Sequence, residues 1–474
     1  MSDAETIMWA VEKDPALRSD FTNVTILDRP PDDAALRAKL RQAVEQIPRL
    51  AHRVVSPPLR LAPPEWRPDP QFDLDYHLRR IATPEPGGMR ELMDVAATAA
   101  AAPFDRSRPL WEFTVVEGLE GGQAALLQKV HHTVTDGVGG LKLSMSLLDF
   151  ERHPAPTAPP KSRVRQVLDD IEAEQRALDG PDAVDRHTPG DVVADAVLYS
   201  VRDGIERAIR GLDAAARRMA HPTDARQGAG DALSFARSLR QQIVTDPSRS
   251  ELLRSRSLGR RFEVVQVGLA DAKRAAAALG GSVNDVFVTA VTGALGSYHD
   301  RMGSPCDELR MAMPVNLRDQ RDDGREEDAG NFFAPARLLV PTRPKEAAAR
   351  FEAVHERLTG VRDDPGLTAT VSLAGLLSPL PTALLVTIAR SQARTLDFAT
   401  SNLRGSPVEL YLAGARVEAN FPMGPRAGVA LNVTLLSYRD SLDLGINLDP
   451  AAVTDPAAFL DCLRESFDAV LSVT

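Results

Sequence analysis

The order of helix-like and strand-like patterns in this chain predicts an α/β sandwich with two sheet-bearing domains. Residues 1–150 mix both patterns, the segment after them is helical and charged, and a second mixed region begins near residue 256. A chain of 474 residues is also longer than a single hydrophobic core usually supports. We therefore predict domains over 1–160 and 256–474, joined by a helical connector over 161–255.

Residues 32–50 predict an amphipathic helix in the first domain, because Asp32 and Asp33 favour a helix N-terminus. The apolar side chains of this segment recur on one helix face: Leu36, Leu40, Val44 and Ile47. Residues 113–119 and 124–130 are typical of neighbouring strands around a glycine-containing turn.

A proline-rich stretch over 153–160 favours a stiff link into the connector. Two segments rich in Gly and Pro, 178–191 and 221–230, interrupt the helical pattern of the connector. The second domain begins with an alternating strand pattern over 261–269, and residues 270–299 predict two helices around a glycine break. Later strand signals fall in 309–318, 408–421 and 429–449.

Composition excludes several classes of protein. The 56 basic and 66 acidic residues give a net charge of −10, which argues against nucleic-acid binding. Only Cys306 and Cys462 are present, so a disulfide framework is not expected and a reducing cytoplasm fits. The N-terminus lacks the features of a signal peptide, and no apolar run reaches the ~20 residues that span a bilayer. We expect a cytoplasmic protein whose membrane or lipid-droplet contact, if any, is peripheral.

Two consecutive histidines, His131 and His132, follow a strand pattern directly, and Asp136 and Gly137 lie in the same loop. Imidazole titrates near neutral pH, so a histidine on a loop between rigid elements is a candidate general base. The alternative is a pair of satisfied polar residues at a strand end, with Asp136 as an ordinary turn residue. A metal site needs further ligands, and His153 is the only other histidine close in sequence, so zinc is not expected.

The pattern HHxxxDG from His131 to Gly137 resembles the signature of the chloramphenicol-acetyltransferase-like superfamily of CoA-dependent acyltransferases and condensation domains. Three further segments are similar to the bacterial wax ester synthase/acyl-CoA:diacylglycerol acyltransferase family: Pro109-Leu110-Trp111, Asn284-Asp285 and residues 401–417. The resemblance extends from Ser2 to the C-terminus, with a poorly matching middle at 151–255. It implies two chloramphenicol-acetyltransferase-like domains with the active site at their interface.

The resemblance implies direct acyl transfer from a long-chain acyl-CoA to an alcohol, without a covalent acyl-enzyme. His132 corresponds to the base that takes the hydroxyl proton, a contribution typically worth ~100- to 10,000-fold in rate. His131 corresponds to a secondary residue that shapes the loop. Asp136 is expected to pair with an arginine and fix the loop, and Gly137 allows a sharp turn beside the substrate. Acyl-CoA is then a co-substrate, and no permanently bound cofactor is implied.

The other motif residues have both a functional and a structural interpretation. Asn284 is a candidate donor to the tetrahedral oxyanion, or an N-cap of the following helix, with Asp285 in the first helical turn. Trp111 lines an acyl channel or fills the core. Ser401 and Asn402 are candidates for substrate hydrogen bonds, although "SNLRGS" departs from the family's usual Ser-Asn-Val-Pro-Gly-Pro.

Two regions suggest contact with anionic or lipid partners. The arginines at the end of the connector suit CoA phosphates or an anionic membrane, with a solvated linker as the alternative: Arg249, Arg254, Arg256, Arg260 and Arg261. Residues 371–393 are the most apolar extended region, which fits a lipid surface or a buried helix equally well.

The favoured function is synthesis of triacylglycerol from diacylglycerol and acyl-CoA, and the first alternative is wax ester synthesis from a long-chain alcohol. Residues 19–32 depart from the family's usual N-terminal strand, so the acceptor stays open among diacylglycerol, monoacylglycerol and long alcohols. A condensation-type enzyme is disfavoured because no carrier or adenylation domain adjoins. Plant-type alcohol acyltransferases usually carry Asp-Phe-Gly-Trp-Gly, which is missing here. A non-catalytic lipid-binding relative is the remaining alternative, and the intact His132 and Asp136 weigh against it.

Overall fold

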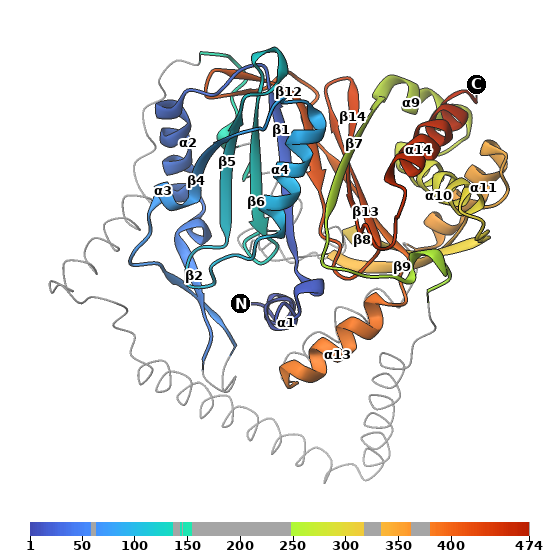
Figure 1. Ribbon diagram of the computed structural model, residues 1–474, viewed down its shortest axis with the longest axis horizontal. Coiled ribbons are helices and arrows are strands. Elements are labelled where there is room, and N and C mark those ends of the chain that lie inside the picture. The colour runs from blue at the N-terminus through green and yellow to red at the C-terminus, as the bar shows by residue number, and fades with distance from the viewer. Residues whose placement is uncertain are drawn as a thin grey trace, which may run out of the picture.

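The computed structural model describes residues 1–57, 63–135, 143–144, 146–153, 248–316, 333–361 and 380–473. Its two halves lie side by side, and each is built on a six-stranded sheet (Figure 1). This arrangement confirms the predicted α/β sandwich with two sheet-bearing domains. Most of the connector predicted over 161–255 lies outside the described residues.

The first sheet contains, in spatial order, β11 (Tyr411–Leu412), β12 (Ala415–Met423), β1 (Asp20–Leu27), β6 (Ala124–His131), β5 (Trp111–Glu117) and β4 (Leu78–Ala82). The second contains β7 (Arg261–Gly268), β14 (Ser441–Leu448), β13 (Leu431–Tyr438), β10 (Phe398–Arg404), β8 (Glu308–Asn316) and β9 (Phe333–Pro341). A short hairpin pairs β2 (His52–Val55) with β3 (Glu65–Pro68).

Helices pack on both halves. The first half has α1 (Asp3–Val11), α2 (Asp33–Gln46), α3 (Leu74–His77) and α4 (Met89–Ala101). The second has α9 (Leu269–Ala278), α10 (Val283–Arg301), α11 (Ala347–Val361), α13 (Thr382–Ala393) and α14 (Pro456–Leu471). The predicted helix near residue 33 is α2, which begins where the Asp32 carboxylate accepts the Ala35 N–H. The predicted strands on either side of the glycine turn are β5 and β6.

The two sheets are not divided cleanly along the chain. Strand β12 comes from the C-terminal half, yet it pairs antiparallel with β1, from Thr22 opposite Met423 to Leu27 opposite Val417. Residues 411–423 of the segment predicted as the second domain therefore complete the sheet of the first. The backbone hydrogen bonds between β1 and β12 tie the two halves together at their centre.

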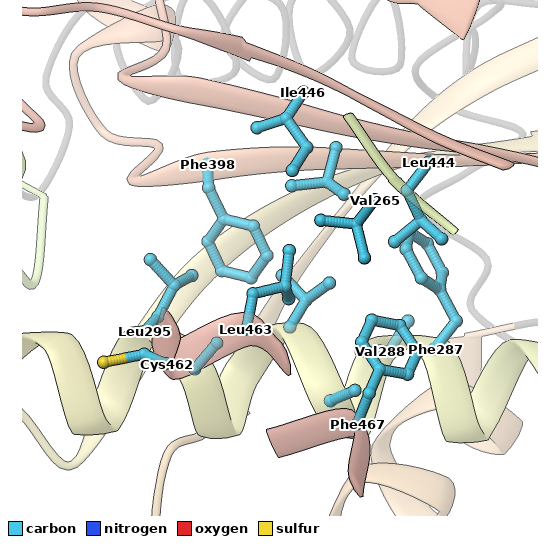
Figure 2. Close-up of a cluster of buried hydrophobic side chains, with 14 of the residues drawn as sticks. Val265, Phe287, Val288, Leu295, Phe398, Leu444, Ile446, Cys462, Leu463 and Phe467 are labelled. Carbon is cyan, nitrogen blue, oxygen red and sulfur yellow. The ribbon is translucent and has the colours of Figure 1, made fainter. Parts of the chain in front are cut away.

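The core of the C-terminal half shows why its long helices form. α10 is buried on almost every side, with Phe287, Val288 and Leu295 fully enclosed. In Figure 2 these side chains face Phe398 of the sheet on one side and Phe467 of α14 on the other. A helix that is apolar all round must be covered all round, and here the sheet, α11 and α14 cover it.

Helix α13 belongs to the region 371–393, predicted as either lipid-facing or buried, of which 371–379 lies outside the described residues. The part that is described packs Leu385 and Ala393 against Ala10 and Val11 of α1. Figure 1 shows α13 beside α1, away from both sheets. Buried contacts with α1 favour the buried-helix interpretation for this part.

Within the described ranges, no single helix is long and apolar enough to cross a membrane. One pair, α9 and α10, meets the length and composition criteria together, and it is bent by 95° at its break.

Candidate active site at the end of strand β6

Strand β6 delivers the two histidines to opposite faces of the first sheet. Asp20 of β1 lies opposite His131, and Phe21 lies opposite Val130. Because side chains alternate along a strand, His131 shares a face with Asp20, whereas Val130 shares the other face with Phe21. The His132 ring lies 5.0 Å from the Phe21 ring, centroid to centroid, so His132 belongs to the second face.

His131 is buried, and both of its ring nitrogens are engaged. Its Nδ1 accepts the backbone N–H of Thr133 at 3.1 Å and lies 2.7 Å from the Thr133 hydroxyl. The ring proton is therefore on Nε2, which lies 2.6 Å from Oε1 of Glu12 at the end of α1. A histidine held in this way can fix the loop, but it has no nitrogen left for a substrate.

His132 has a different environment, because its side chain is only half-buried. Its backbone N–H donates to the Ser19 carbonyl at 3.1 Å, which extends the pairing with β1 into the loop. The next residues are also anchored, since Arg49 donates to the Thr133 carbonyl at 3.0 Å and pairs with the buried Glu5 of α1 at 2.7 Å. The backbone on both sides of the His132 side chain is thus fixed by contacts from other elements. Asp136 and Gly137 lie outside the described residues, and their roles stay predictions.

A buried ion pair joins the two halves beside the histidines. Arg260, just before β7, donates to both carboxylate oxygens of Asp20, at 2.7 and 3.2 Å. Burial alone would raise the pKa of the Asp20 carboxyl, but the adjacent Arg260 guanidinium outweighs burial, and the pKa lies below its ordinary value. Lys129 faces the same carboxylate and adds to this effect.

Most arginines of the predicted cluster form hydrogen bonds or ion pairs within the protein. Besides Arg260, Arg256 donates to the carbonyls of Gly428 and Leu396. Arg261 pairs with Glu263 at 2.7 Å while remaining partly exposed. The prediction of a shared patch for CoA phosphates is therefore wrong for Arg256 and Arg260, whose guanidinium groups hold the fold together.

The structure brings two of the predicted motifs into contact. The Nδ2 amide of Asn402 on β10 donates to Oδ1 of Asn284 on α10 at 3.2 Å. Ser401 is half-buried opposite Thr434 of β13. Because Asn284 Oδ1 accepts this bond, the amide N–H groups of Asn284 point elsewhere and can still act as donors.

The alternative role of Asn284 as an N-cap is wrong. Ser282 caps α10, and its hydroxyl exchanges hydrogen bonds with Asp285 in a capping box. Asp285 lies in the first turn as predicted, and it is also 3.2 Å from Nδ1 of His355 on α11. The spacing Ser-x-x-Asp was visible in the sequence and could have identified the cap.

Trp111 lies in the core of the first half, fully enclosed. Its indole N–H donates to the Leu50 carbonyl at 2.8 Å, and its ring stacks on His77 at 4.4 Å between centroids. These contacts are those of a packing residue. Burial lowers the pKa of His77 to about 4, so its imidazole is neutral at physiological pH.

Sequence reasoning missed the residues that support the histidine loop, namely Glu5, Glu12, Asp20 and Arg49. Each reaches the loop from a distant part of the chain, and a single sequence offers no local signal for such contacts. Within the described part of the chain, no group of three His, Cys, Asp or Glu side chains is arranged to hold a metal ion.

Comparison with known proteins identifies the family. Residues 2–287 match the model of the wax ester synthase/diacylglycerol acyltransferase catalytic domain, and residues 329–470 match that of its C-terminal domain. The chain belongs to the wax ester synthase/diacylglycerol acyltransferase family. It is therefore an acyltransferase of this family, whose substrates are an acyl-CoA and an acceptor lipid.

Two relatives from Mycobacterium tuberculosis H37Rv, both named "putative diacylglycerol O-acyltransferase", are 35% and 30% identical to the chain. The alignments cover 100% and 95% of this chain, and 92% of each relative. Among solved structures, the wax ester synthase/diacylglycerol acyltransferase from Marinobacter aquaeolei VT8 superposes with a TM-score of 0.63 at 22% identity, covering 99% of this chain and 98% of that one. The first condensation domain of the calcium-dependent antibiotic synthetase superposes with a TM-score of 0.56 at 17% identity, covering 100% and 96%. These two structures share the fold.

Proposed function

We propose that this chain transfers the acyl group of a long-chain acyl-CoA to the hydroxyl of diacylglycerol and so makes triacylglycerol. The observation that carries the mechanism is the contrast between the two histidines. His131 is buried with both ring nitrogens engaged, whereas the side chain of His132 is half-buried at a strand end. The relatives named as diacylglycerol acyltransferases support the choice of acceptor.

In the proposed reaction, His132 takes the proton of the acceptor hydroxyl as its oxygen attacks the thioester carbonyl carbon. A C–O bond forms and gives a tetrahedral oxyanion. The C–S bond then breaks, and the imidazolium returns the proton to the departing CoA sulfur. No residue becomes acylated, so the products are the ester and free CoA, and no resident cofactor is needed.

Two parts of the site assist this reaction in our proposal. The Asn284 amide, oriented by its bond with Asn402, donates to the oxyanion; a single such donor is typically worth about 100- to 1,000-fold in kcat. Asp136 and Gly137 shape the loop that presents His132. Because diacylglycerol is insoluble in water, the enzyme meets it at the cytoplasmic surface of a membrane or lipid droplet.

Release of free thiol from palmitoyl-CoA by the purified full chain tests the proposal. Dioleoylglycerol, monooleoylglycerol and hexadecanol are supplied in turn, and the ester product is identified by mass spectrometry. We expect dioleoylglycerol to raise thiol release well above hydrolysis and to yield triacylglycerol. An enzyme active only with hexadecanol would be a wax ester synthase, and one that no acceptor stimulates would contradict the proposed activity.

The two histidines give a matched pair of variants. His132→Ala should lower kcat at least ~100-fold with little change in the unfolding midpoint, because the lost group acts as the base. His131→Ala should lower the unfolding midpoint, because it leaves Glu12 and Thr133 without their partner. Unchanged ester synthesis by His132→Ala would exclude it as the base.

A further inference from the structure

Two neighbouring arginines lie on the face of the second sheet that the helices do not cover. Figure 2 shows Phe398 of β10 pointing into the helical layer. Side chains alternate along a strand, so Ala399 points to the other face, as does Ala312 of β8, which lies opposite Ala399. Arg337 of β9 is the direct partner of Ala312, and Arg310 lies two positions before Ala312. The two guanidinium groups therefore share the face without helices.

The positive charge of Arg337 has no counter-charge nearby. The charged group that acts on Arg337 is Arg310, a second cation, and among the residues that the structure describes no carboxylate pairs with Arg337. Its side chain is exposed to solvent, yet enough protein surrounds it that burial lowers the pKa of the guanidinium. Arg310 donates to the Thr395 carbonyl at 3.3 Å, which holds the second charge in place. Like charges on neighbouring strands repel each other, so this position favours a bound anion.

The same face of the second sheet meets the histidine end of the first sheet. Gly424, the residue after β12, lies against β13, because a Cβ atom there would be only 2.6 Å from Oγ1 of Thr434 and 2.8 Å from Nδ2 of Asn432. β12 pairs with β1 up to the residue next to Phe21, whose ring contacts the ring of His132. His132 is therefore close to β13 on the face that carries the two arginines.

Small side chains lie between β13 and the arginines. Ser401 and Ala399 of β10 and Ala312 of β8 are each only half-buried, so they form an open floor. Three strand spacings separate β13 from β9, which is roughly 14 Å. The pantetheine arm of CoA has about thirteen bonds from its sulfur to the nearer phosphorus, and it spans roughly 15 Å if three bonds advance about 3.5 Å. An arm that begins at His132 and lies along this floor brings its phosphates to the arginines.

We infer that Arg337 and Arg310 bind the phosphates of the acyl-CoA donor. The inference rests on the proposed function, which places the thioester at His132. Guanidinium groups bind phosphate oxygens through charge-assisted hydrogen bonds, and a phosphate supplies the negative charge that Arg337 lacks. Two of the arginines predicted for this role from the connector, Arg256 and Arg260, are instead engaged inside the fold.

The experiment compares two acyl donors that differ only in the nucleotide and its phosphates. Wild type and variants release thiol from palmitoyl-CoA or from palmitoyl-pantetheine, which has no phosphate, with whichever acceptor gives the highest rate. We expect Arg337→Gln to lower kcat/KM about 10-fold with palmitoyl-CoA and to leave it unchanged with palmitoyl-pantetheine, because a charge-assisted contact is lost. Arg337→Lys keeps the charge and should recover most of the loss.

Arg357→Gln is the matched control. Arg357 is an exposed arginine of the same half, but it lies on α11, on the helical side of the sheet. Its removal should leave kcat/KM at the wild-type value with both donors.

Several results would overturn the inference. One is an equal fall of Arg337→Gln with both donors, and another is a wild type that does not distinguish the donors, which needs no variant to fold. A variant that loses binding to phosphatidylglycerol vesicles but keeps wild-type kinetics with palmitoyl-CoA would assign the arginines to a lipid headgroup instead. If no acceptor supports thiol release, the proposed function fails, and calorimetric titration of wild type and Arg337→Gln with CoA alone still decides the inference: equal affinities would contradict it.

Discussion

Removing Arg260 should cost more stability than removing any exposed arginine of this chain. The side chains of Arg260 and Asp20 are 10% and 4% exposed, and two hydrogen bonds join them. Arg260→Ala leaves the Asp20 carboxylate buried without its counter-charge. Breaking a buried pair in this way typically costs about 3–5 kcal/mol, because the remaining charge is neither paired nor hydrated.

The pH dependence of this loss has a definite sign. In wild type the pKa of Asp20 lies below its ordinary value, so the pair stabilises the fold above the unfolded-state pKa and loses that effect as pH falls through the folded one. In Arg260→Ala, burial acts without Arg260 and raises the pKa of Asp20. The difference between wild type and variant should therefore be largest near neutral pH and shrink below about pH 4.

Urea unfolding followed by tryptophan fluorescence measures the effect, since all three tryptophans lie in the first 111 residues and report on the half that contains Asp20. Arg261→Ala is the matched control. Arg261 is the next residue and also forms an ion pair, with Glu263, but its own side chain is 40% exposed. Exposed pairs are worth about 0–1 kcal/mol. If Arg260→Ala and Arg261→Ala shift the midpoint equally, the buried pair does not hold the halves together as argued.

Three further changes test other contacts. Glu12→Ala should lower the unfolding free energy by about 1–3 kcal/mol, since His131 Nε2 and the Ser19 N–H lose their acceptor; a wild-type urea midpoint would contradict this. Trp111→Phe removes the indole hydrogen bond to the Leu50 carbonyl and should lower the unfolding free energy by about 1 kcal/mol, without altering the preference for acyl-chain length. A changed preference across a series of acyl-CoA substrates would instead mean that the ring lines the acyl channel. Burial lowers the pKa of His77 to about 4, so as the pH falls the imidazole is protonated in the unfolded chain before it is protonated in the folded one. Stability should therefore fall as the pH drops from about 6.5 to about 4. His77→Phe should flatten this part of a pH series of urea midpoints.

The sequence was sufficient wherever structure depends on local patterns. α2 follows from its apolar face and Asp32, and β5 and β6 follow from alternation around a glycine turn. The order of motifs also led to the correct family. For α2, β5 and β6 the residues that decide the structure lie within about twenty positions of one another, and each family motif is likewise a short local pattern, so the spacing is readable.

What the sequence could not provide was pairing across the chain. Nothing in β1 indicates that Thr22 lies opposite Met423, and the apolar pattern of β12 alone fits either sheet. The same holds for Glu12 and His131, because an acidic residue at a helix end has many possible roles. The arginines near residue 256 were misassigned for a related reason: clustering in sequence suggested a shared ligand, whereas Arg256 and Arg260 point to different buried partners.

These distant contacts explain how a strand-end histidine pair can contain both an anchor and the base that we propose. Consecutive residues at the end of a strand face opposite sides, so one histidine can be buried while its neighbour is presented. The anchor, His131, depends on Glu12 of α1, and α1 is in turn held by α13 from the other half. Arg260 and β12 reach the same region from the C-terminal half. Because three separate contacts from the second half support the loop, the first half alone should fold poorly around His132, and the proposed active site should need the assembled pair of domains.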